Sequence, residues 1–145
     1  MPILCGGETF DRVYSDLCFK YSPLTDSWLE YGTMPYARGY SASAYLKDFG
    51  LVMAGGYDGS GLESGVLDSV IVTKDGYTFD ELESLPVPSY YGCLAVADEQ
   101  TLLLTGGFTE EMPNGETWVL SYDIPTDTWT RCSAEKSWLY QNMSL

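Results

Sequence analysis

Histidine is absent from this chain, and its absence removes much of the chemistry that side chains usually perform in enzymes. Without it there is no Ser-His-Asp or Cys-His nucleophile system. Zinc, copper and non-haem iron sites with imidazole ligands are excluded as well. Carboxylate, lysine and tyrosine chemistry remains possible, but no segment gathers those groups into a recognisable pattern. We therefore predict no catalytic, cofactor-binding or metal-binding residues, and a protein that is not an enzyme.

Acidic residues dominate the charged side chains, since 21 Asp and Glu against 7 Lys and Arg give a formal net charge of −14. This charge argues against nucleic acid as a partner, because phosphate binding needs clustered basic side chains. It also argues against an anionic membrane surface, and no apolar run reaches the roughly 18 residues of a membrane helix. A basic protein partner fits the charge, and solubility alone would also explain it.

Seven acidic residues fall in three segments, at 8–14, 57–65 and 108–116. If the fold brought these segments to one face, they would present a negative field to a basic partner. Solvated loops without a partner are the alternative, and no segment has the alternating ligands of a calcium loop. The candidate partner-binding residues are Glu8, Asp11, Asp58, Glu63, Glu110, Glu111 and Glu116.

The chain also has four cysteines. No CxxC motif is present among them, which argues against a metal site with thiolate ligands. They can form disulfides or remain buried thiols. Which of these holds depends on the strands that carry them. The cysteines are Cys5, Cys18, Cys93 and Cys132.

The elements that must position these residues repeat with a period of about fifty residues. Two adjacent glycines mark each repeat directly after a short apolar run, and successive pairs are 49 and 51 residues apart. Apolar runs that end in glycine favour strands buried on both faces. Paired glycines permit the positive-φ backbone that a crowded turn needs. The pairs are Gly6-Gly7, Gly55-Gly56 and Gly106-Gly107.

A second mark lies downstream of each glycine pair, where two aromatic or branched residues stand seven positions apart with turn residues between them. This spacing predicts a hairpin, and apolar residues alternate in the strand that precedes it. The second repeat differs from the others in having valine and phenylalanine instead of tyrosine and tryptophan. The marker residues are Tyr21 and Trp28, Val72 and Phe79, and Tyr122 and Trp129.

Each complete repeat should therefore contain four strands, while the first lacks its opening strand. The distance from the glycines to the hairpin varies slightly between repeats, so the three acidic segments should be loops on one exposed face. The strands of the middle and third repeats are expected at about 40–46, 50–54, 67–73 and 78–83, and at about 90–97, 101–105, 117–123 and 128–132.

An apolar run, a glycine pair and a spaced Tyr and Trp, repeating near fifty residues, resemble the Kelch repeat. Met34-Pro35 ahead of Arg38-Gly39-Tyr40 is similar to the Kelch join between blades, as is Leu85-Pro86 ahead of Tyr90-Tyr91. The resemblance covers residues 2–132 and implies an all-β fold, a partial β-propeller of about three four-stranded blades. It divides the chain into a partial blade at 2–35, blades at 36–86 and 87–132, and a tail at 133–145 outside the pattern.

The number of blades departs from the family, because propellers of this kind usually close with about six blades. An open array leaves apolar blade faces without a neighbour. We therefore expect a fragment of a larger propeller, with self-association that completes the ring as an alternative.

The resemblance also implies a function, since Kelch propellers commonly act as non-enzymatic protein-protein interaction modules. Two alternatives remain open: part of a Kelch-like propeller enzyme whose catalytic residues lie outside this chain, and a truncated product with no independent role. A peptide-binding surface that includes Arg38, Tyr40, Tyr57, Tyr90 and Tyr91 is one hypothesis for the interaction site. Packing between blades would explain these residues equally well.

The cysteine pattern can now be interpreted on the expected strands. Cys5 and Cys18 lie on antiparallel neighbours, where a disulfide is possible. Some secreted Kelch-type proteins look similar at these two positions, which supports a bridge; two buried thiols in a cytosolic propeller are the alternative. The compartment stays open, and an extracellular one is favoured if the bridge forms. Cys93 and Cys132 fall on the first and last strands of one blade, so we do not expect them to pair.

Overall fold

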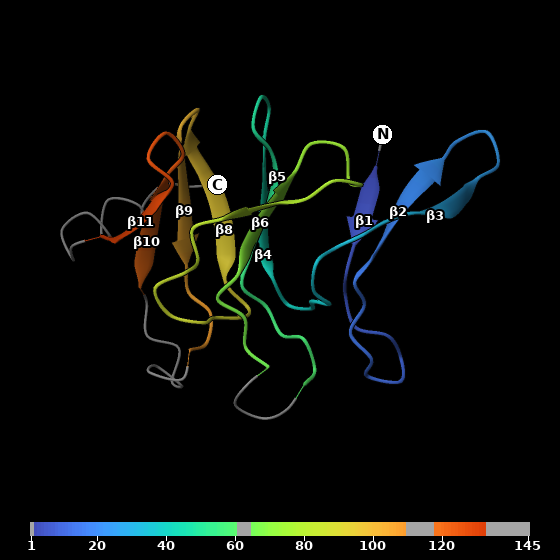
Figure 1. The fold of residues 1–145 in the computed structure, drawn as a ribbon, viewed down its shortest axis with the longest axis horizontal. Coiled ribbons are helices and arrows are strands. Elements are labelled where there is room, and N and C mark those ends of the chain that lie inside the picture. Colours follow the sequence, from blue (N-terminus) through green and yellow to red (C-terminus); the bar gives the residue numbers. More distant parts are fainter. Residues whose placement is uncertain (1, 61–64, 110–117, 133–145) are drawn as a thin grey trace.

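The computed structural model describes residues 2–60, 65–109 and 118–132. Within these ranges the chain forms eleven strands in three antiparallel sheets and no helix, so the predicted all-β fold is confirmed. The three sheets stand side by side along the molecule, as blades of a propeller do (Figure 1). No helix in the described ranges is long and apolar enough to cross a membrane.

Each sheet is a meander in which every strand pairs with the one before it in the chain. The first sheet has three strands, and the second and third have four each, with the order of the sequence kept across the sheet. The strands are β1 (Ile3–Cys5), β2 (Leu17–Ser22) and β3 (Ser27–Thr33); β4 (Ala42–Leu46), β5 (Gly50–Ala54), β6 (Val70–Thr73) and β7 (Asp80–Leu82); and β8 (Cys93–Asp98), β9 (Thr101–Thr105), β10 (Val119–Asp123) and β11 (Thr128–Arg131).

The opening strands of the second and third sheets begin later than the sequence predicts. Strands were expected from about residues 40 and 90, whereas β4 begins at Ala42 and β8 at Cys93. Tyr40 and Tyr91, which precede these strands, have φ of 56° and 60°. A left-handed residue cannot continue an extended strand, so pairing starts only after it.

The hairpins of the first and third sheets are closed by the same hydrogen bond. The hydroxyl groups of Tyr21 and Tyr122 donate to Oδ1 of Asp26 and Asp127, each over 2.6 Å. Both aspartates have a left-handed backbone, with φ of 47° and 51°, which Asp tolerates better than most residues. The predicted turns therefore form at residues suited to them.

The marker residues of these two hairpins pack as ring pairs, while those of the second repeat do not. The ring centroids of Tyr21 and Trp28 are 5.4 Å apart, and the corresponding pair in the third sheet, Tyr122 and Trp129, is at 4.8 Å. In the second sheet Val72 belongs to the core shared with the third sheet. Phe79 packs instead on the cluster beside the first sheet.

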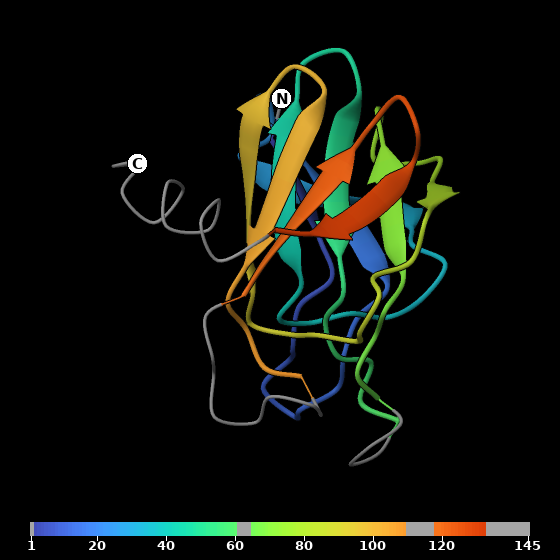
Figure 2. The same ribbon diagram turned by 90° about the vertical axis from the view of Figure 1, so that its left-hand side faces the viewer.

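The apolar core consists of two layers between neighbouring sheets. The larger layer lies between the second and third sheets. Its members include four fully buried side chains, those of Val52, Leu102, Leu104 and Tyr122. β4 contacts β8 across this layer, and Figure 2 shows the third sheet in front of the second. The smaller layer lies between the first and second sheets and is built around Ile71. β6 is therefore buried on both faces, whereas the sequence predicts alternating apolar residues in the strand that precedes each hairpin.

The glycine pairs lie where one sheet meets the next. A Cβ at Gly6 would lie 2.4 Å from the carbonyl oxygen of Arg38, and one at Gly55 would lie 2.2 Å from that of Ser89. In both cases the following glycine donates its N–H to the same carbonyl over 2.8 Å. At Gly106, by contrast, nothing in the described residues lies within 4 Å. The close approach between sheets thus requires glycine at the first two positions.

Candidate binding surface

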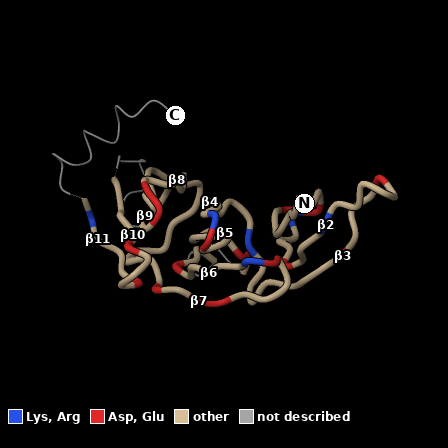
Figure 3. The backbone as a smooth tube through the Cα atoms, turned by 90° about the horizontal axis from the view of Figure 1, so that it is seen from above, with Lys and Arg blue, Asp and Glu red and all other residues tan. Residues whose placement is uncertain are grey.

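One end of the molecule, opposite the hairpin turns, holds the links between sheets and the described parts of the acidic segments, which are residues 8–14, 57–60, 65 and 108–109 (Figure 1). Acidic residues are spread over all three sheets (Figure 3). Glu8 and Asp11 are exposed, while Asp58 is half-buried and accepts a hydrogen bond of 2.7 Å from the N–H of Ser60. The remaining candidates, Glu63, Glu110, Glu111 and Glu116, lie outside the described residues.

Six aromatic side chains gather at this end and form what we call the aromatic cluster. They come from the β1–β2 loop, from the links before β4 and β8, and from the residues that follow the second and third glycine pairs. Short backbone bridges fix them, because the residue after each of these glycine pairs bridges to the link before the same sheet. The members are Tyr14, Tyr40, Tyr57, Tyr90, Tyr91 and Phe108.

The rings of the cluster contact one another in a continuous series. Tyr40 stacks on Tyr91 at a centroid distance of 4.4 Å and an angle of 29°. Tyr14 meets Tyr40 and Tyr57 edge to face, at 5.9 and 5.2 Å. Such contacts stabilise aromatic pairs beyond the burial of area alone. The rings are thus held in place by each other.

The outer members of the cluster are open to solvent. The side chain of Tyr91 is 54% exposed and that of Phe108 is 41% exposed. Their rings are set at 81° with centroids 6.1 Å apart, and the ring of Tyr90 lies within 5.7 Å of both. The cluster therefore presents ring faces and edges that a ligand can reach.

A carboxylate lies at the other side of the stacked pair. The hydroxyl of Tyr40 donates a short hydrogen bond to Oε2 of Glu8, which raises the pKa of the Tyr40 phenol well above its usual value. A phenol that donates to a carboxylate keeps its proton, because ionisation would place two negative charges together. Tyr40 therefore stays neutral in the physiological range and links Glu8 to the ring stack.

Tyr40 and Tyr91 occupy equivalent positions in their links, and both have the left-handed backbone described above. A bulky residue in this conformation costs roughly 1–3 kcal/mol, which the surrounding structure must offset. The N–H of Tyr91 donates to the carbonyl oxygen of Tyr40 over 2.9 Å, so the two strained residues also support each other. Strain of this kind is concentrated at functional sites, and here it occurs in the backbone of two tyrosines whose rings stack on each other.

Arg38 does not belong to this surface, so that part of the peptide-binding hypothesis is wrong. Its side chain is 1% exposed. It donates to the carbonyl oxygens of Gly55 and Ser69 over 3.2 and 3.3 Å and to Oγ of Ser69 over 2.9 Å. Burial lowers the pKa of the guanidinium to about 10. Through these hydrogen bonds, Arg38 joins the link before β4 to the residues that follow β5 and precede β6. This is a packing role.

The structure joins Cys5 and Cys18 in a disulfide between β1 and β2. The two residues are direct partners in the strand register, with Cα atoms 4.1 Å apart. The next pair along is hydrogen-bonded, since the N–H of Gly6 donates to the carbonyl oxygen of Leu17 over 3.0 Å. The cysteines therefore form a non-hydrogen-bonded pair, in which side chains approach most closely. The bridge closes the loop that carries Tyr14 of the cluster and the neighbouring Glu8.

The other two cysteines are far from each other in their sheet. Cys93 lies on β8, and Cys132 follows β11, so they stand at opposite edges of the third sheet. The N–H of Cys132 donates to the carbonyl oxygen of Val119 over 2.9 Å.

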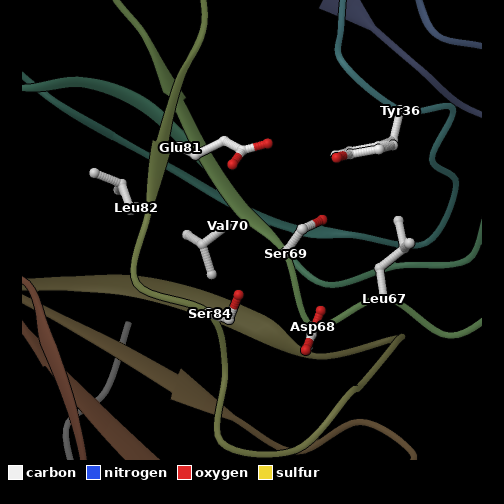
Figure 4. Close-up of a pocket in the computed structure, with 8 residues that line it drawn as sticks. All are labelled: Tyr36, Leu67, Asp68, Ser69, Val70, Glu81, Leu82 and Ser84. Carbon is white, nitrogen blue, oxygen red and sulfur yellow. The ribbon is translucent and has the colours of Figure 1, made fainter.

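A cavity of about 250 Å³ lies beside β6 and β7, and none of the residues that line it belongs to the aromatic cluster (Figure 4). Its lining includes the carboxylates of Asp68 and Glu81 and the phenol of Tyr36, but no lysine, arginine or cysteine. Among the described residues no group of three or more His, Cys, Asp or Glu is placed to hold a metal ion. We assign no chemistry to this cavity.

Sequence reasoning missed two members of the cluster. Phe108 follows its glycine pair as Tyr57 follows the pair before it, so alignment of the repeats could have identified it. Tyr14 carries no such signal. Its ring lies between Gly39 and Gly59, where Cβ atoms would approach it to 2.8 and 2.6 Å, and only the folded structure reveals this.

Comparison with known proteins identifies a Kelch motif at residues 89–134. The chain is also similar to an N-acetylneuraminate epimerase of Pasteurella multocida (strain Pm70), with 31% identity over 81 residues. The aligned part is 56% of this chain and 21% of the epimerase, so the chain spans only a small part of that relative's length. Together these matches confirm the predicted resemblance to the Kelch family, and the matched motif contains all four strands of the third sheet.

Proposed function

We propose that this chain is a non-enzymatic protein-binding module and that the aromatic cluster is its contact surface. One observation carries the proposal: six aromatic side chains from all three sheets converge at one end, with Tyr91 and Phe108 exposed by 54% and 41%. Tyrosine is enriched in binding hot spots because it offers a large contact area with few rotatable bonds. Rings already fixed by their neighbours lose little further entropy when a partner binds.

The charge of the chain supports a basic partner. The formal net charge is −14, and exposed Glu8 lies directly beside the cluster. A negative field steers positively charged partners toward the surface and raises their association rate. Binding should therefore weaken as salt concentration rises.

A role as part of an enzyme that acts on a sugar acid is the second candidate, and the similarity to the N-acetylneuraminate epimerase favours it. Exposed aromatic rings also suit the apolar face of a sugar. Against this candidate, N-acetylneuraminate carries a carboxylate, and the carboxylate of Glu8, which is hydrogen-bonded to Tyr40 of the cluster, would repel it. Titration of the chain with N-acetylneuraminate, followed through the NMR signals of the aromatic rings, tests this candidate.

A random peptide library displayed on phage and selected against the folded chain tests the leading proposal. We expect enriched peptides that bind the native chain and lose binding to a Tyr91→Ala/Phe108→Ala variant. Tyr45→Ala is the matched control, because Tyr45 is 67% exposed and lies near the other end of β4. Absence of any enriched peptide, or equal binding to all three proteins, would contradict the proposal.

A further inference from the structure

The exposed part of the aromatic cluster has the features of a site for a positively charged group. The face of an aromatic ring carries negative potential, and cations bind to it within about 6 Å of the centroid. Tyr91 and Phe108 are exposed and nearly perpendicular, with Tyr90 beside both. A cation at this corner can contact more than one ring, as in the aromatic cages that bind ammonium groups.

The charges around the cluster favour the same ligand. Tyr91 stacks on Tyr40, whose hydroxyl is bonded to the carboxylate of Glu8. The nearest buried cation, Arg38, directs its guanidinium to the backbone of the second sheet and not to the rings. The cation–π contact recorded among the described residues joins Lys20 to Tyr31 in the first sheet, at 4.3 Å. Among the described residues, no lysine or arginine makes a cation–π contact with Tyr91 or Phe108.

The flat faces of the individual rings distinguish between the two basic side chains. A guanidinium group is flat, stacks on aromatic faces and is more weakly hydrated than an ammonium group. A ring fixed by contacts with its neighbours provides a rigid flat face on which a guanidinium can stack. Arginine is therefore favoured over lysine at this place.

We propose that the Tyr91–Phe108 corner of the aromatic cluster binds an arginine side chain of a partner protein, with Glu8 providing a nearby negative charge. This inference rests on the proposed function, because it assigns the chemistry of the partner to the same surface. It goes further in stating which side chain is recognised and which rings recognise it.

The test uses two blocked peptides that differ only in charge, one with arginines alternating with glycine and one with citrulline in place of each arginine. Citrulline keeps the size and planarity of arginine and lacks its charge. Binding to the full chain is followed by fluorescence anisotropy of a labelled peptide. We expect the arginine peptide to bind at least about fivefold more tightly than the citrulline peptide.

Two substitutions at one position separate ring electrostatics from apolar contact. Tyr91→Phe keeps the ring face, and Tyr91→Leu keeps apolar area without it; both carry the same backbone strain at this left-handed position. The ratio of the affinities for the arginine and citrulline peptides should be unchanged in Tyr91→Phe. In Tyr91→Leu this ratio should fall to about half or less of its native value. Circular dichroism of each variant verifies that the sheets remain folded.

The outcomes distinguish this inference from the function on which it rests. Equal binding of the arginine and citrulline peptides, or equal preference in the two Tyr91 variants, overturns the arginine site. If the library then still yields peptides that depend on Tyr91 and Phe108, the protein-binding function stands with a different ligand chemistry. If the library yields none, the proposed function fails as well.

Discussion

Alanine substitutions at the first glycine of each pair test how the sheets are held together. Gly6, Gly55 and Gly106 are equivalent in the three repeats and have similar backbones, with φ of 71°, 62° and 68°. Their surroundings differ, because a Cβ would clash with a backbone carbonyl at the first two positions and would meet nothing within 4 Å at the third. The same chemical change therefore isolates the contact between sheets.

The expected losses follow from two separate costs. An alanine in a left-handed conformation costs roughly 1–2 kcal/mol, and this cost is common to all three positions. At Gly55 the new Cβ would lie 2.2 Å from the carbonyl oxygen of Ser89, so the second and third sheets must separate. Overpacking of this kind costs typically about 1–3 kcal/mol more. We expect Gly55→Ala and Gly6→Ala to lose about 2–5 kcal/mol and Gly106→Ala only about 1–2 kcal/mol.

Urea unfolding of the four proteins, followed by far-UV circular dichroism, measures these losses. The unsubstituted chain should have the highest urea midpoint and Gly106→Ala the next highest. The midpoints of Gly55→Ala and Gly6→Ala should lie well below that of Gly106→Ala. The slope of free energy against urea should stay constant, because the surface exposed on unfolding is unchanged. Equal losses at all three positions would refute the reasoning, since strain alone would then explain them.

Three further predictions concern single features of the fold. Asp75 accepts hydrogen bonds from the N–H groups of Tyr77 and Thr78, which lowers the pKa of its carboxyl to about 2. The carboxylate of Asp75 therefore stabilises the fold fully above the usual pKa of Asp, and this stabilisation is lost as the pH falls through 2. The difference in Tm between the native chain and Asp75→Asn should narrow from pH 5 to pH 2, and a constant difference contradicts this. Arg38→Met removes the side-chain donor to the carbonyl oxygen of buried Gly55 and should lose about 1–3 kcal/mol in urea unfolding, whereas a gain would contradict the packing role. The Cys5→Ser/Cys18→Ser variant should lose about 2–4 kcal/mol, because the disulfide joins residues 13 apart, and an unchanged midpoint would argue against the bridge.

The sheets could be predicted from the sequence because their marks are local. The glycine pairs, the alternation before each hairpin and the turn residues specify three similar units, and the structure has three sheets with these strands. The starts of β4 and β8 could not be predicted, because a tyrosine gives no indication that its backbone will be left-handed. At these residues the N–H of Tyr91 donates to the carbonyl oxygen of Tyr40, a contact between two links that the sequence does not reveal.

The candidate surface was harder to predict, because it is assembled from five separate parts of the chain. Tyr40, Tyr57, Tyr90 and Tyr91 were identified as a group, and they do lie together. Arg38 was placed with them because arginine is common in binding sites, yet it is buried under backbone carbonyls. Burial of a long polar side chain depends on packing between sheets, which a single sequence does not reveal.

The central claim is that partners bind at the aromatic cluster, and NMR of the chain with labelled tyrosine and phenylalanine rings tests it most directly. On addition of the arginine peptide, the signals of Tyr40, Tyr91 and Phe108 should shift together. Those of Tyr45 and Tyr77, which are 67% and 62% exposed but lie outside the cluster, should stay unchanged. Shifts confined to Tyr45 or Tyr77, with the cluster unaffected, would contradict the account.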